Sequence, residues 1–298
     1  GGQHGYFHPI AWYNEFDGGR AFYTALGHTD ESYSEPLFQQ HIMGGIQYAI
    51  GDNRLDYNQA TASLVPEENR FVKQVLINNL NEPMELEVFR DGKVLFIERK
   101  GAVKLYDPKV GQTRQIATMD VHTKFEDGLL GIALDPNYYK NHWIYLYYSP
   151  AGEKPIQRLS RFVFIADSLI LPSEKPILEV PVQREKCCHT GGSIEFGPEG
   201  YLYLSTGDDT SPFNDKSLTY NSDGYAPQNE MQGWEPYDAQ RSSGNTNDLR
   251  GKILRINVND DATYSIPSGN LFPPEDSLSK PEIYVMGCRN PYRINIDQ

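Results

Sequence analysis

Cysteine is scarce in this sequence, since only three occur among its 298 residues. Three are too few for the disulfide framework of a small secreted domain, and two of them, Cys187 and Cys188, are adjacent. Long apolar runs are also lacking, because no stretch approaches the roughly 18 residues that a membrane helix requires. We therefore expect no membrane insertion, while the cysteine count alone does not identify a cellular compartment.

Basic residues are fewer than acidic ones, with 27 Lys and Arg against 40 Asp and Glu, which gives a net charge of -13. Such a surface repels phosphate backbones, so we expect no nucleic-acid partner. Hydrophobic residues make up 39% of the chain and charged residues 22%, which indicates a globular protein rather than a disordered one. The 20 tyrosines favour half-buried β-strands.

Residues 1–51 have a short α/β pattern. The stretch 20–26 predicts a buried strand, and Ser34 is the predicted N-cap of a helix that ends at Gly51. One strand and one helix cannot bury a core of their own. We therefore expect this segment to be the C-terminal remnant of a larger domain, followed by a polar linker over residues 52–73.

From about residue 74 the apolar residues follow a period of two, which is typical of strands. The predicted strands fall into three similar units, at residues 84–89, 94–97 and 103–106, then 128–134, 143–148 and 159–164, then 192–196, 201–204 and 251–256. A fourth unit is expected to begin at residues 283–286. Repeated antiparallel units of this kind indicate propeller blades. We expect residues 74–298 to be mainly β, an incomplete β-propeller of about three to four blades, and the chain to be part of something longer.

His189 lies just before Gly191 and Gly192, at the expected start of an inner strand of the third blade. Inner strands line the central channel, where a histidine has a suitable pKa for a general base. The two glycines would let a planar ligand approach the backbone closely. A histidine held by structural hydrogen bonds is the alternative.

Arg289 and Asn290 are expected to face the same channel from the start of the next inner strand. The planar guanidinium of arginine can donate two parallel hydrogen bonds to a carboxylate, and the asparagine amide has both a donor and an acceptor. The alternative for Arg289 is an ion pair between blades.

Five motifs occur in order: Gly128-Leu129-Leu130-Gly131, His189-Thr190-Gly191-Gly192, Gly207-Asp208, Leu249-Arg250-Gly251-Lys252 and Gly287-Cys288-Arg289-Asn290-Pro291. Together they resemble the glucose/sorbosone dehydrogenase family over about residues 75–298. Members are soluble six-bladed propellers of the bacterial periplasm that depend on pyrroloquinoline quinone (PQQ). The resemblance therefore implies a six-bladed-type propeller in a periplasmic or extracellular location in bacteria.

The resemblance also implies an activity, the oxidation of an aldose sugar or related alcohol to a lactone, with electrons passed to a cytochrome or another external acceptor. The residue matching His189 takes the proton of the anomeric hydroxyl, and those matching Arg289 and Asn290 contact the PQQ cofactor. Calcium is implied as well, although the family's calcium ligands lie in a later blade. The alternative function is a propeller of the same lineage that binds carbohydrate or protein without turnover.

Two positions depart from the family pattern. Cys188 stands where well-studied members carry an acidic residue that orients the channel histidine, and Glu126-Asp127 stand where they carry glutamine. We expect Glu126, Asp127 and Asp208 to contact sugar hydroxyls, with a solvated turn as the alternative for the first two.

Three alternatives remain open for the adjacent cysteines, namely a vicinal disulfide that stiffens the loop before His189, two free thiols, or metal binding. Asn214-Asp215 and residues 221–224 could bind calcium, but they lack the full spacing of known loops, and a solvated loop is the alternative.

The N-terminal segment resembles a second family. His8-Pro9, Trp12-Tyr13 and residues 19–28 are similar to the end of a ThuA-like trehalose-utilisation domain, whose fold is related to class I glutamine amidotransferases. The match covers only about fifty residues.

Overall fold

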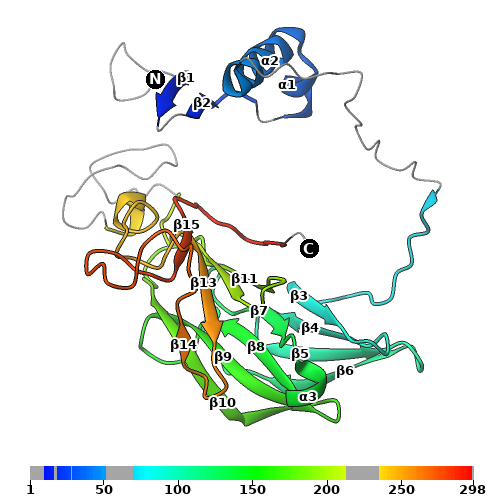
Figure 1. The fold of residues 1–298 in the computed structure, drawn as a ribbon. Coiled ribbons are helices and arrows are strands. Elements are labelled where there is room, and N and C mark those ends of the chain that lie inside the picture. Colours follow the sequence, from blue (N-terminus) through cyan, green and yellow to red (C-terminus); the bar gives the residue numbers. More distant parts are fainter. Residues whose placement is uncertain (1–9, 17–18, 28, 52–69, 213–234, 297–298) are drawn as a thin grey trace. The chain divides into compact units, whose positions relative to one another are not determined.

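The computed structural model describes residues 10–16, 19–27, 29–51, 70–212 and 235–296 (Figure 1). The chain divides into two compact units, Gly1–Gln74 and Val75–Gln298. Within the described residues, no helix combines the length and the apolar character needed to cross a bilayer.

In the first unit, β1 (Ala11–Phe16) pairs antiparallel with β2 (Gly19–Thr24). Two helices follow, α1 (Asp30–Ser34) and α2 (Pro36–Ile50), and the chain leaves α2 through Gly51 at a φ of 65°. The helix prediction is confirmed, although Glu35 rather than Ser34 occupies the N-cap. The predicted strand is confirmed as β2, but its expected burial is wrong, because β2 is the exposed to half-buried arm of a hairpin.

The second unit is built from three antiparallel sheets whose strands follow chain order, apart from the last strand of the third sheet. The first sheet contains β3 (Pro83–Val88), β4 (Val94–Glu98), β5 (Ala102–Asp107) and β6 (Gln112–Thr118). The second contains β7 (Leu129–Leu134), β8 (Trp143–Tyr148), β9 (Ile156–Ile165) and β10 (Ser168–Pro181). The third contains β11 (Gly191–Phe196), β12 (Leu202–Thr206), β13 (Lys252–Val258), β14 (Tyr264–Ser265) and β15 (Ile283–Met286). Short helical turns interrupt the connections: α3 (Tyr138–Asn141), Glu235–Tyr237 and Ala239–Arg241.

The prediction of a fourth unit at residues 283–286 is wrong. Strand β15 pairs with β13, with Val285 opposite Ile253, so it completes the third sheet (Figure 1). Strands β6 and β10 were not predicted from the sequence. Strand β6 is largely exposed and lacks an alternating apolar face. The mainly β prediction is confirmed, with three blade-like sheets of at least four strands each.

The middle sheet packs on both of its neighbours, and its side chains divide between two cores. In β8, Ile144, Leu146 and Tyr148 enter the core shared with the first sheet. Tyr145 and Tyr147 alternate with them and enter the core shared with the third sheet. Because successive strand residues point to opposite faces, this one strand joins all three sheets. The stacking fixes the inner strands β3, β7 and β11, with β7 contacting the other two.

Candidate functional site

His189 occupies the loop directly before β11, in the left-handed backbone region at a φ of 65°. Its side chain is buried, with 5% of the residue exposed. Ring atom Nδ1 lies 2.7 Å from Oδ1 of Asp208, which follows strand β12 and is equally buried. A carboxylate can only accept, so Nδ1 carries the proton and Nε2 presents its lone pair.

Asp208 can therefore orient the imidazole of His189, and its expected contact with sugar hydroxyls stays a prediction. Its Oδ1 accepts hydrogen bonds from His189 and from the backbone N–H of Thr210, at 2.9 Å for the second. Cys188 stands where family members carry a carboxylate that orients the histidine. In this chain the carboxylate that contacts the imidazole is that of Asp208, which follows strand β12.

The glycines around His189 serve the packing of the protein itself. A Cβ on Gly207 would lie 1.8 Å from the carbonyl oxygen of His189, and one on Gly192 would lie 2.6 Å from Cβ of Leu130. The space beside Gly191 is likewise filled, by the backbone of Gly207. The expectation that Gly191 and Gly192 leave room for a planar ligand is therefore wrong.

Glu126 fixes the backbone of the histidine loop. Its Oε2 accepts hydrogen bonds from the backbone N–H groups of His189, at 2.6 Å, and Thr190, at 3.3 Å. This carboxylate is thus neither a solvated turn residue nor, through this oxygen, free to bind a sugar. It holds the backbone of His189, whereas the imidazole makes its own hydrogen bond to Asp208.

Asp127 is held by structural contacts, and its expected contact with a sugar stays a prediction. It is 6% exposed, and Oδ1 accepts a hydrogen bond from Oγ of Ser149 at 2.8 Å. Arg99 donates to its backbone carbonyl at 2.6 Å. These contacts close the turn before β7.

Arg289 and Asn290 lie beside the histidine, as predicted. Oδ1 of Asn290 accepts from the backbone N–H of Gly191 at 3.0 Å, and the carbonyl of Arg289 accepts from the N–H of Asp208 at 2.9 Å. The Arg289 side chain is exposed, and across the described part of the chain its guanidinium has neither a hydrogen bond nor an ion pair. The alternative of an ion pair between blades is therefore not found among these residues.

Asp209 is a buried neighbour of this site that the sequence did not single out. Its carboxylate accepts from the backbone N–H of Gln183 at 2.6 Å and from Arg250 at 3.1 Å. Burial raises the pKa of Asp209 to about 7. The Leu249-Arg250-Gly251 motif was the available signal, because Arg250 reaches back to this carboxylate.

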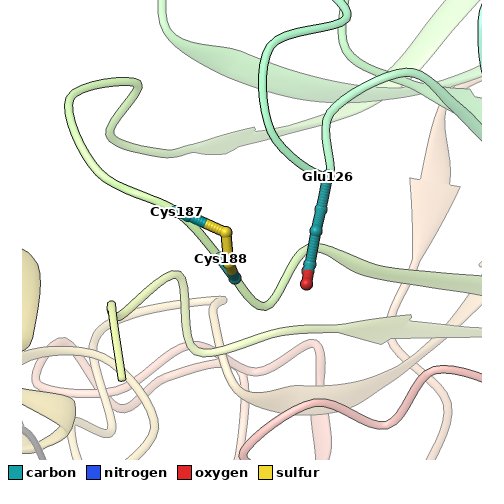
Figure 2. A group of neighbouring side chains, drawn as sticks. All are labelled: Glu126, Cys187 and Cys188. Carbon is teal, nitrogen blue, oxygen red and sulfur yellow. A yellow bond between two sulfur atoms is a disulfide. The ribbon is translucent and has the colours of Figure 1, made fainter. Parts of the chain in front are cut away.

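The adjacent cysteines form a disulfide, and Figure 2 shows the carboxylate of Glu126 next to the sulfur atoms. Cys188 is buried, and Cys288 is a free thiol. Of the three alternatives for Cys187 and Cys188, the vicinal disulfide is the one found. The candidate calcium loop at Asn214-Asp215 and residues 221–224 lies outside the described residues.

Two family models match different parts of the chain. The model described as Glucose / Sorbosone dehydrogenase covers residues 80–298, which contain all three sheets and the site around His189. The model described as Trehalose utilisation covers residues 2–49.

Individual relatives agree with the longer match. Hedgehog-interacting protein of Homo sapiens is 28% identical over 77% of this chain and 32% of its own length. Quinoprotein glucose dehydrogenase B of Acinetobacter calcoaceticus is 27% identical over 74% of this chain and 45% of its own length. The structure of the PQQ-bound aldose sugar dehydrogenase of Streptomyces coelicolor has a TM-score of 0.52 at 26% identity, covering 74% of this chain and 55% of that one. The chain thus spans less than half the length of these two curated relatives, and its propeller-type fold is confirmed.

Proposed function

This chain belongs to the glucose/sorbosone dehydrogenase family, and from that premise we propose that it takes part in PQQ-dependent oxidation of an aldose sugar or related alcohol to a lactone. Electrons would pass to a cytochrome or another external acceptor. The buried His189–Asp208 pair, with Nδ1 and Oδ1 2.7 Å apart, carries the proposal. A histidine whose ring is oriented by a carboxylate is suited to act as a general base.

The proton chemistry follows from this geometry. Nε2 of His189 has no hydrogen-bond partner among the described residues, so it can accept a proton from a substrate hydroxyl. The Asp208 carboxylate keeps the proton on Nδ1 and stabilises the imidazolium that forms. Glu126 keeps the backbone of His189 in place during the transfer. Two residues therefore position this base, Asp208 through its ring and Glu126 through its backbone.

The residues beside this base suit an anionic cofactor. Asn290 is fixed on Gly191, and the unpaired guanidinium of Arg289 is suited to the carboxylates of PQQ. When bound, the quinone would supply the acceptor for the hydride of the substrate carbon. Among the described residues, the cluster of three His, Cys, Asp or Glu side chains that could share an ion includes two cysteine sulfurs, whereas calcium prefers oxygen. The resemblance implies calcium ligands in a later blade.

The vicinal disulfide supports a periplasmic or extracellular location, which we also propose. Disulfides persist in oxidising compartments and are uncommon in a reducing cytosol.

A second candidate function is a propeller that binds carbohydrate or protein without turnover. The specific observation in its favour is the similarity to a human relative named for its interaction with Hedgehog. The two functions differ in turnover, because the binding function oxidises neither a bound carbohydrate nor a bound protein.

Sugar-dependent reduction of a redox dye by the purified protein tests the proposal. The protein is reconstituted with PQQ and calcium and offered a broad panel of aldoses, with samples lacking PQQ as the control. We expect dye reduction with at least one aldose, and only in the presence of PQQ. Sugar binding without any dye reduction would favour the binding function instead.

A further inference from the structure

Cys187, Cys188 and Glu126 form a compact set of side chains (Figure 2), and Glu126 also accepts a hydrogen bond from the backbone N–H of His189. One ligand atom from each, two sulfurs and a carboxylate oxygen, lies within 4.8 Å of the other two. In the disulfide the sulfurs are bonded to each other and do not act as thiolate ligands. Once the disulfide is reduced, the two sulfurs and the carboxylate oxygen can all act as metal ligands.

The loop that carries the cysteines is held at both ends by contacts that do not involve the disulfide. Before it, Oε1 of Gln183 accepts from the backbone N–H groups of Glu185, at 2.9 Å, and Lys186, at 2.8 Å. After it, Glu126 accepts from the N–H of His189 at 2.6 Å. Reduction therefore leaves both thiols in a short segment between two fixed points, close to the carboxylate.

We propose that reduction of the Cys187–Cys188 disulfide creates a binding site for a thiophilic divalent cation such as zinc, with Cys187, Cys188 and Glu126 as ligands. A dithiol reductant supplies two electrons and two protons, so that the S–S bond breaks, both cysteines become thiols and the reductant becomes its own disulfide. Cation binding then displaces the two thiol protons to solvent. Zinc accepts two thiolates and a carboxylate and completes its tetrahedron with water.

This site has a structural consequence for His189. The carboxylate that the cation recruits is the one that holds the backbone N–H groups of His189 and Thr190. Cation binding therefore competes with these hydrogen bonds and loosens the histidine loop. The inference goes beyond the proposed function, because metal binding can be measured without any catalysis.

Cadmium is the probe, since its thiolate complexes absorb in the near ultraviolet. The purified protein is reduced with a phosphine, freed of reductant and titrated with Cd²⁺ alongside the oxidised protein. We expect the reduced protein to bind one cation per chain with a thiolate-to-cadmium band, and the oxidised protein to show no such band. A large excess of zinc should compete for the same site and reduce the band.

Three variants identify the ligands. Cys288→Ser, the matched control, should keep the band, whereas Cys187→Ser with Cys188→Ser should abolish it. Glu126→Gln should weaken the affinity at least roughly tenfold, because one charged ligand is lost. Alkylating the reduced wild-type protein before titration tests the thiols without relying on the fold of a variant. Equal binding by oxidised protein, by alkylated protein or by the double variant would overturn the proposal, as would a lost band in Cys288→Ser or an unchanged affinity in Glu126→Gln.

Discussion

Oδ1 of Asp208 lies 2.7 Å from Nδ1 of His189, and both residues are buried. The two residues come from neighbouring strand ends, since His189 precedes β11 and Asp208 follows β12. The carboxylate that pairs with the imidazole thus reaches it from the other strand of the hairpin, and not from position 188.

Replacing Asp208 with asparagine should impair turnover rather than substrate binding. The amide keeps the size of the carboxylate but cannot stabilise an imidazolium, and it permits the wrong tautomer of His189. We expect kcat to fall at least about 100-fold with little change in KM. Steady-state dye reduction measures both constants, and an equal fall in Asp208→Asn and the surface control Asp91→Asn would contradict the positioning role.

The sequence predicted the positions of most strands and the histidine but not how the site is connected. Period-two patterns located β8 and β11, whereas the exposed strand β6 has no such pattern. The apolar character of β15 does not reveal which sheet it joins. Contacts across long separations, such as Glu126 with the N–H of His189, depend on sheet stacking that local sequence does not encode. Adjacent cysteines likewise carry no signal of their oxidation state.

Lys252 should be essential for stability. It is fully buried, and Nζ donates to the carbonyls of Ser242 at 2.8 Å, Ser243 at 3.1 Å and Arg250 at 2.7 Å. Lys252→Met leaves three carbonyl acceptors, two of them on buried serines, without this donor, and we expect a loss of about 2–4 kcal/mol in the free energy of unfolding. Urea denaturation of wild type and variant measures this difference in the free energy of unfolding.

The control for that substitution is Lys100→Met. The Lys100 side chain is 53% exposed and pairs with Glu82 at the surface, so its removal should cost less than about 1 kcal/mol. Similar losses for the two variants would show that the buried hydrogen bonds of Lys252 are not the cause.

Glu87 should make stability depend on pH. Burial, with the nearby charges of Glu195 and Glu85, raises the pKa of Glu87 from 4.5 to about 7. The native state therefore binds more protons than the unfolded state between these values, so its stability falls as pH rises through this window. Well above pH 7, Glu87 is ionised in the native state, and the native state carries the full cost of that buried charge.

Glu87→Gln tests that contribution, because glutamine cannot ionise. We expect the variant to melt about 2–4 °C above wild type at pH 8 and to show no such gain at pH 4.5. Thermal melts at the two pH values measure the difference, with the exposed Glu199→Gln as control. A gain of equal size at both pH values would rule out titration of Glu87 as the cause.

The most direct test of the central claim is sugar-dependent dye reduction by His189→Gln compared with His142→Gln, each reconstituted with PQQ and calcium. His142 lies at the end of α3, outside the site, and is the matched control. We expect the rate to fall at least about 100-fold in His189→Gln and to stay near the wild-type value in His142→Gln. Wild-type turnover that persists in His189→Gln would contradict the assignment of His189 as the base.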